Sequence, residues 1–236
     1  MKVALCLSGI VGGVEGKGGR GTDTDYVVCS KLLKEFVIEP NDCDVFIHSW
    51  SVEHKENLVE LYKPKSYIFE PQIDFSINPN RNKSNYQSKW YSIIQSLLQV
   101  GRFGEYDWVI ITRFDIMFLQ NLNLSEFDSN YLYMPNYSVY PKNTNRERWE
   151  IPPKNNQSLK RRVLHDMYII ASYTNTLKLA FNEPQNWFYN SSVNPHKANR
   201  ARVINIFGNI SDVVRFWGYR GYEWDLYRWK ICHSKS

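Results

Sequence analysis

The triplet Arg113-Phe114-Asp115 carries the most informative chemistry in the sequence. It follows the apolar run Trp108–Thr112, which is typical of a strand covered on both faces. A carboxylate at the end of such a strand can bind a hard divalent cation, with phosphate oxygens and water completing the coordination shell. The structural alternative is that Asp115 caps the following turn and pairs with Arg113. The residues alone leave both interpretations open.

Seven of the 12 glycines lie between residues 9 and 21, and they call for an explanation. The P-loop pattern GxxxxGK[ST] is absent, because no serine or threonine follows the Gly-Lys pair there. The dinucleotide pattern GxGxxG does occur over residues 16–21. It should follow the first strand directly, but it begins eight residues after Ser8. It also requires an acid at the end of the second strand, whereas Asp44 begins that strand. The segment is therefore either a loop whose amides and Arg20 approach a diphosphate, or an ordinary surface loop.

Apolar runs and amphipathic segments alternate through the first half of the chain. They predict strands at residues 2–8, 44–50, 66–70 and 108–112, and helices at 24–37 and 52–61. Thr22 or Asp23 is the expected cap of the first helix. A further helix ends at Gly101 and follows a polar stretch at 76–88. Its apolar stripe is Trp90, Ile93, Ile94, Leu97 and Leu98, with Lys89, Ser92 and Ser96 on the opposite side.

This alternation predicts an α/β fold with a mostly parallel central sheet flanked by helices. We expect a single domain over residues 1–236. Ligands of such sheets bind beyond the carboxyl ends of the strands. Those ends carry the glycine segment, His48-Ser49-Trp50, Glu70-Pro71 and Arg113-Phe114-Asp115. His48 shares a strand face with Phe46 and Trp50, which favours a packed structural histidine over a ligand.

The second half of the chain is less regular. Strands are expected at 131–134 and 167–171, and a short helix at 174–181. Residues 136–162 are loop-like, and their seven basic and two acidic residues account for the net charge of +5. This segment indicates an anionic partner or a solvated loop. The tail at 215–229 is dense in aromatic residues, which either stack on sugar rings or pack in the core as part of a closing helix.

Composition excludes several classes of protein. The chain has 43% hydrophobic and 22% charged residues, so it is neither disordered nor fibrous. No apolar run approaches the ~18–20 residues that a membrane span needs. The four cysteines form no CxxC pair, and reduced core thiols favour a cytoplasmic protein. No nucleic-acid-binding motif is present, so nucleic acid is not an expected partner.

Four segments in this order resemble one enzyme family: KVALCLSG, DVFIHSW, SKWYSIIQSL and YDWVIITRFDIMF. They look like the N-terminal half of GT-A-type glycosyltransferases, similar to those of bacterial capsule or lipopolysaccharide clusters and of some large DNA viruses. The resemblance covers about residues 2–120, with a weaker echo at LHDMYIIAS, residues 164–172. Residues 1–120 would be the nucleotide-sugar-binding half and 121–236 the acceptor-binding half.

The resemblance implies transfer of a sugar from a UDP- or GDP-sugar donor to a glycan acceptor. Ser8, Gly9 and the following loop would hold the nucleotide, with Lys89 as a second phosphate contact. Asp115 matches the last acid of the family's DxD motif, which holds Mn²⁺ or Mg²⁺ against the diphosphate. Arg113 replaces the first acid and could itself offset diphosphate charge, which leaves metal dependence open.

Residues of the second half complete the site that the resemblance implies. Asp166 is the candidate catalytic base, and His165 is the alternative base. The structural alternative is that Asp166 forms a turn or caps a helix. A late histidine, His196 or His233, would be a further metal ligand. The competing function is a non-catalytic nucleotide- or sugar-binding protein of the same fold, which the replacement of the first acid by Arg113 permits.

Overall fold

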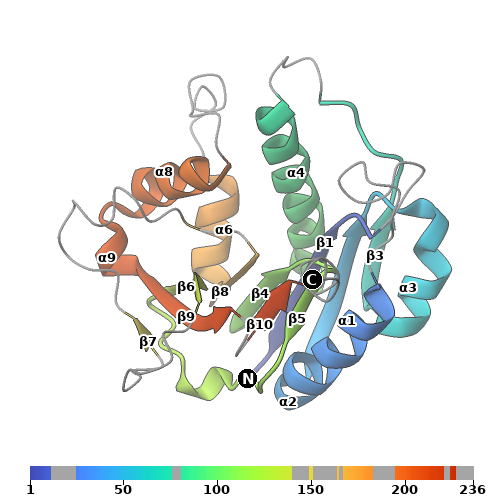
Figure 1. Cartoon of the computed structure of the whole chain (residues 1–236), viewed down its shortest axis with the longest axis horizontal. Coiled ribbons are helices and arrows are strands. Elements are labelled where there is room, and N and C mark those ends of the chain that lie inside the picture. Colours follow the sequence, from blue (N-terminus) through green and yellow to red (C-terminus); the bar gives the residue numbers. More distant parts are fainter. Residues whose placement is uncertain are drawn as a thin grey trace, which may run out of the picture.

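The computed structural model describes residues 1–11, 25–75, 81–139, 149–150, 164, 167–182, 195–220 and 224–226. Strands and helices alternate in the first half, as the sequence predicts (Figure 1). The strands there are β1 (Val3–Gly9), β2 (Cys43–Ser49), β3 (Ser66–Phe69) and β4 (Trp108–Thr112). The helices are α1 (Tyr26–Leu33), α2 (Glu39–Asn41), α3 (Lys55–Tyr62) and α4 (Arg81–Gly101), with a π-helical turn at Lys34–Ile38 and a 3-10 turn at Val52–His54.

The second half contains more regular structure than the sequence predicts. Its strands are β5 (Ile116–Phe118), β6 (Leu132–Val139), β7 (Trp149–Glu150), β8 (Tyr168–Ser172), β9 (Val214–Arg220) and β10 (Trp224–Leu226). Its helices are α6 (Tyr173–Phe181), α8 (Pro195–Phe207) and α9 (Ile210–Val213), with a 3-10 turn at Leu124–Glu126. Part of the expected 136–162 loop is therefore strand, because β6 and β7 both pair with β9. The aromatic tail forms β9 and β10 instead of a helix, as aromatic residues favour.

The strands join into one sheet in the order β3-β2-β1-β4-β8-β6-β9-β10-β5, and β7 also pairs with β9. The first four of these strands are all parallel. The sheet then turns antiparallel at β8, which pairs with β4 and with β6. The expected α/β class with a mostly parallel sheet flanked by helices is thus confirmed for the described residues, and it is compatible with a Rossmann-like fold.

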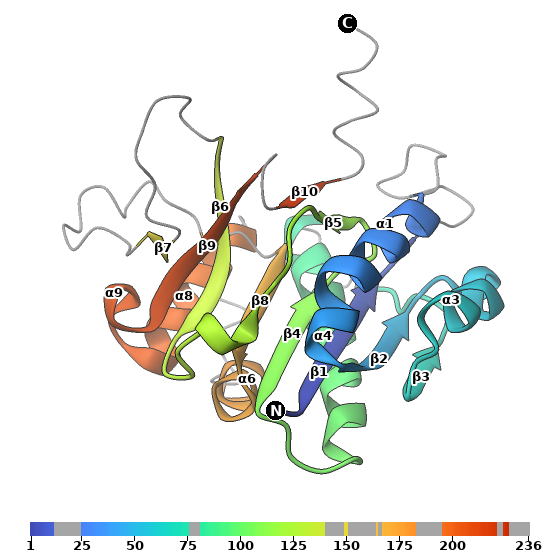
Figure 2. The ribbon, with the colours of Figure 1, turned by 90° about the horizontal axis from the view of Figure 1, so that it is seen from below.

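Two buried clusters show that helices cover both faces of the sheet. Val3, Leu5 and Leu7 of β1 pack in a cluster that includes Leu33 of α1. Ala4 and Cys6 of β1 face the other way, into a cluster built around the inner residues of α4. Alternate residues of one strand therefore fill two cores, which explains why β1 is apolar almost throughout. Figure 2 shows the sheet with α1 and α4 on its two sides.

Two local predictions need correction. Asp25, and neither Thr22 nor Asp23, caps α1: its Oδ1 accepts a hydrogen bond from the Val28 amide at 3.1 Å. Helix α4 begins at Arg81, inside the polar stretch expected to precede it.

The buried side of α4 also differs from the expected one. Ser92 and Ser96 are fully buried, whereas Leu98 is 48% exposed. The reason is tertiary: α4 packs against β1 and β2 on one side and against α6 and α8 on another. Two contact surfaces bury more of the helix than a single apolar stripe predicts.

Two expectations from composition can be compared with the described residues. No helix among them is long and apolar enough to span a bilayer. Cys6, Cys29 and Cys43 are thiols in the described part of the chain, and the expected fourth thiol, Cys232, lies outside it. Burial raises the pKa of Cys6 to about 12, so this thiol has little nucleophilic character.

Candidate functional site

The order of the first four strands defines where a ligand would bind. The chain leaves β1 through α1 and reaches β2 on one side of β1, whereas it leaves β3 through α4 and reaches β4 on the other side. A crevice forms at such a switch point, outside the carboxyl ends of the strands. Ser8 and Gly9 end β1, and Arg113 follows β4 directly. The register pairs Leu7 with Thr112, so Ser8 and Arg113 are the next residues of these two neighbouring strands.

Arg113 and Asp115 form a bidentate ion pair at this edge. The Arg113 Nε donates to Asp115 Oδ1 at 2.9 Å, and Nη2 donates to Oδ2 at 2.5 Å. The side chain of Asp115 is fully buried, and that of Arg113 is 19% exposed. The pairing of Asp115 with Arg113 is the part of the structural alternative that the described residues show. The charge that a ligand can reach is therefore that of the guanidinium, with the carboxylate behind it.

The geometry of this pair bears on the expected metal. Both oxygens of Asp115 already accept hydrogen bonds from a cation, and a divalent ion there would meet the positive charge of Arg113. Within the described ranges, no group of three or more His, Cys, Asp or Glu side chains is placed to hold a metal ion. In the described part of the chain, the Asp115 carboxylate is thus held by a cation of the protein itself. The metal remains a prediction from the resemblance, and no chemical step below depends on it.

Ser8 and Gly9 are both well placed, but they differ in what they can offer a ligand. The Gly9 amide donates to Ser92 Oγ at 3.0 Å, and its carbonyl accepts from the Trp50 amide at 3.2 Å and from Ser49 Oγ at 2.9 Å. Its backbone groups are thus committed within the protein. Ser8 is 4% exposed, and its hydroxyl bonds to no residue in the described part of the chain. Ser8 is therefore the better ligand contact of the two.

Behind this edge lies a buried polar network centred on His48. The His48 side chain is fully buried; its Nδ1 lies 2.7 Å from Ser92 Oγ, and its Nε2 lies 3.0 Å from Glu70 Oε1. Because a carboxylate only accepts, we assign the ring proton to Nε2 and let the Ser92 hydroxyl donate to Nδ1. The network joins the ends of β1, β2 and β3 to α4, which confirms a structural histidine.

Sequence reasoning missed Ser92 and Glu70 as partners of His48. Ser92 was expected on the polar side of its helix, and Glu70 was noted only as the residue that follows a strand. They lie 44 and 22 residues from His48 in the chain, so no local pattern links the three. The one available signal was that Glu70 and His48 both fall at carboxyl ends of strands expected to be neighbours.

Burial of His48 predicts a pH dependence of stability. Desolvation lowers the pKa of His48, and the hydrogen bond and charge of Glu70 oppose that shift. As the pH falls, the unfolded chain therefore takes up a proton before the folded protein does. The free energy of unfolding should be highest above pH ~6.5 and fall below it, by at most about 1.4 kcal/mol per pH unit.

Urea unfolding of the wild type and of His48→Gln at about pH 7.5 and 5.5 tests this prediction, because glutamine keeps a donor and an acceptor but does not titrate near these pH values. The wild type should lose more free energy of unfolding than the variant on acidification. Equal losses would show that His48 does not titrate differently in the two states.

An aromatic cluster borders the network on its exposed side. Trp50 stacks on Tyr91 with ring centroids 5.3 Å apart, and Phe75 packs edge-on against both. Burial, together with the hydrogen bond and charge of Glu70, raises the pKa of Tyr91. Trp50, which follows β2, is buried, whereas the rings of Phe75 and of Tyr91 on α4 are partly exposed next to the Glu70 carboxylate. Flat ligands such as nucleobases suit such a surface.

Lys89 lies on α4, one turn before Ser92. Its Nζ is 5.4 Å from the centroid of the Trp90 ring. The lysine is thus on the helix that borders the crevice, and its expected phosphate contact stays a prediction.

Several expected site residues lie outside the described part of the chain. These are Arg20 with the glycines from residue 12 onward, the candidate bases Asp166 and His165, and His233; the side chain of His196 is outside it too. Met167, which follows Asp166 in the sequence, is described, and its Sδ lies 3.5 Å from Arg113 Nη1. Among the aromatic tail residues, Trp217 is fully buried and belongs to the core.

Neither a protein-family model nor a curated protein matches this chain.

Proposed function

We propose that the protein binds a nucleotide sugar and transfers its sugar to an acceptor hydroxyl on a glycan. The observation that carries the proposal is the switch point between β1 and β4, where Ser8 and Arg113 adjoin. The aromatic cluster at the ends of β2 and β3 supplies a stacking surface along the same edge. The position of these residues supports nucleotide binding. The family resemblance of residues 2–120 supports the class of reaction, which is sugar transfer.

In the proposed reaction the leaving group is a nucleoside diphosphate, so negative charge grows on its phosphate oxygens as the sugar bond breaks. The Arg113 guanidinium would stabilise that charge, held in place by its two hydrogen bonds to Asp115. The Ser8 hydroxyl would donate to the same ligand. A base must take the proton of the acceptor hydroxyl, and Asp166 is the residue we propose for it.

Ser8 provides a clean test of donor binding. Because its hydroxyl has no partner among the described residues, Ser8→Ala should leave the free energy of unfolding unchanged. It should weaken UDP or GDP binding about three- to tenfold, the worth of one hydrogen bond. Ser30→Ala is the matched control, since Ser30 is equally buried but its hydroxyl donates to the Val27 carbonyl. The control should lose stability and keep nucleotide affinity. Calorimetric titration and urea unfolding measure the two quantities.

The nucleotide itself is tested by thermal shift with UDP- and GDP-sugars, with and without Mn²⁺. A real site should be stabilised by about 2–3 kcal/mol when ligand reaches roughly one hundred times its Kd. No response to any of these nucleotides would contradict the proposal.

A second candidate function is favoured by one observation, the ion pair that neutralises Asp115. A protein that keeps the crevice but lacks metal chemistry would bind nucleotide sugars without turning them over. Stabilisation by a nucleotide with neither hydrolysis nor transfer of its sugar would support this binding protein over the transferase.

A further inference from the structure

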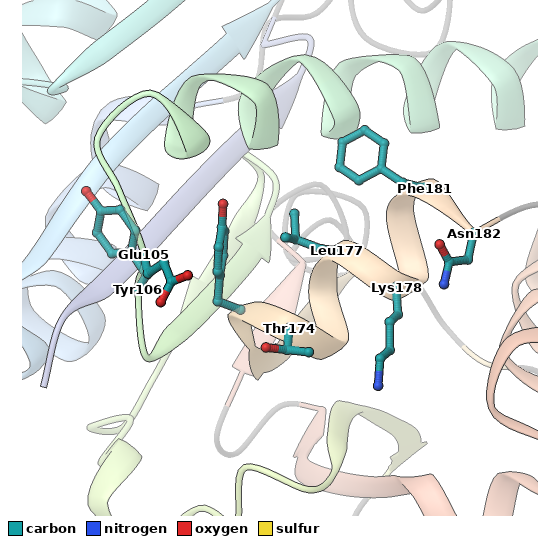
Figure 3. A pocket seen from close by; sticks show the side chains of 8 residues that line it. Glu105, Tyr106, Thr174, Leu177, Lys178, Phe181 and Asn182 are labelled. Carbon is teal, nitrogen blue, oxygen red and sulfur yellow. The ribbon is translucent and has the colours of Figure 1, made fainter.

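A cavity lies at the amino end of β4, away from the candidate site. It has a volume of about 470 Å³ and lies between the segment that leads into β4 and the helix that follows β8 (Figure 3). Strand β4 runs from Trp108 near this cavity to Thr112 near Arg113, so the cavity and the candidate site lie at opposite ends of one strand. The lining residues are Glu105, Tyr106, Tyr173, Thr174, Leu177, Lys178, Phe181 and Asn182.

Two aromatic side chains of the cavity wall differ: the ring of Tyr106 is held in place, and that of Phe181 is exposed. Tyr106 is 5% exposed, and its hydroxyl donates to Asp44 Oδ2 at 2.7 Å, which fixes the ring. Phe181 on α6 is 45% exposed, so part of its ring surface is open to a ligand. In Figure 3, Glu105 lies at one end of the cavity and Phe181 at the other, with Leu177 between them.

The polar groups of the cavity are available to a ligand. The side chains of five lining residues make no hydrogen bond or ion pair with any other described residue: Glu105, Tyr173, Thr174, Lys178 and Asn182. They supply a carboxylate, two hydroxyls, an ammonium group and an amide. The one negative and the one positive charge cancel, so the cavity does not select for a charged ligand.

We propose that this cavity binds a neutral oligosaccharide. Sugar rings carry apolar faces that pack on aromatic side chains and a rim of hydroxyls that both donate and accept, which is the chemistry these residues offer. The volume lies within the usual range of small-molecule sites.

This inference goes beyond the proposed transfer, because the cavity lies away from the crevice where the donor would bind. The role of this cavity in sugar transfer rests on the proposed function. Holding a glycan at a second point on the same protein raises the effective concentration of its acceptor end.

NMR spectra of the backbone amides test the proposal. The full chain is titrated with maltotriose, cellotriose and chitotriose at millimolar concentration. At least one sugar should give saturable shifts confined to residues 105–107 and 173–182. Phe181→Ala and Glu105→Gln should each weaken that binding about tenfold, through the lost ring contact and the lost charged acceptor. Tyr67→Ala is the matched control, because Tyr67 is a similarly exposed aromatic residue, at 42%, on the edge strand β3.

Three results would overturn the inference: no saturable shifts with any of the three sugars, shifts that persist in both cavity variants, or tighter binding of a sulfated trisaccharide than of the neutral ones. Failure of the proposed transfer is separable from these outcomes. If the protein binds the oligosaccharide but shows no response to nucleotide sugars, the proposed oligosaccharide site stands and the proposed donor site is wrong.

Discussion

Asp115→Ala is expected to abolish sugar transfer and to lower the free energy of unfolding by about 3 kcal/mol. The substitution removes the two hydrogen bonds that the Arg113 guanidinium donates to Asp115, and the side chain of Arg113 is only 19% exposed. A partly buried cation that loses its carboxylate pays its desolvation cost without the compensating attraction. Arg113 also loses the geometry that aims it at the donor phosphates. Urea unfolding and a radiolabelled-donor transfer assay measure the two effects.

A double variant separates the functional effect from the loss of stability. Arg113→Met combined with Asp115→Leu replaces both charges by apolar side chains, so that neither partner is left as an uncompensated buried charge. We expect the double variant to unfold within about 1 kcal/mol of the wild type and still to show no transfer. If Asp115→Ala kept a tenth of the wild-type turnover, the proposed role of the pair would be wrong.

Ser92→Ala is expected to have the next largest effect, with about 3 kcal/mol lost from the free energy of unfolding. The alanine leaves two buried groups without their partner: the Gly9 amide, which donates to Ser92 Oγ, and His48 Nδ1. Each unsatisfied buried group costs about 1–3 kcal/mol. Because Gly9 ends β1 beside Ser8, the variant should also bind nucleotide more weakly than the wild type.

Ser96→Ala is the matched control for this change. Ser96 is as buried as Ser92 and lies on the same helix. Its hydroxyl donates to the Ile93 carbonyl of its own turn, and its contact across to β1 is with the weakly hydrogen-bonding thiol of Cys6. We expect Ser96→Ala to cost less than about 1 kcal/mol and to leave nucleotide affinity unchanged. Similar losses for the two serines in urea unfolding would falsify the linking role of Ser92.

Much of the first half of the fold could be predicted because its signals are local. The run at residues 108–112 is apolar throughout and forms a strand with those same bounds. The alternation of strands and helices predicted the parallel sheet, which the pairing of β1 with β2 and β4 confirms. The second half was harder, because β6, β7 and β9 are held by partners far along the chain.

The candidate site divides in the same way. Arg113 and the glycine segment could be placed at one edge from the sequence because the ends of apolar strands are visible in it and parallel strands bring their ends together; the role of Ser8 is implied by the resemblance. Whether Asp115 faces a metal or its own arginine was not decidable, since both arrangements suit the same three residues. The bidentate pair is a property of how the turn after β4 is buried.

The sequence by itself determined the alternation of elements, the edge of the sheet where a ligand would lie and the residues at that edge, because these follow from short-range periodicity and from the geometry of parallel strands. Only the tertiary structure decided which polar side chains are satisfied internally and which are free. The hydroxyl of Ser92 became the partner of His48 because α4 is packed on two sides, which buries a position that periodicity assigns to solvent. On the neighbouring strand β1, the hydroxyl of Ser8 makes no hydrogen bond with any residue that the structure describes. Contacts of this kind depend on the rotation of a helix against a sheet, which residues distant in sequence set together.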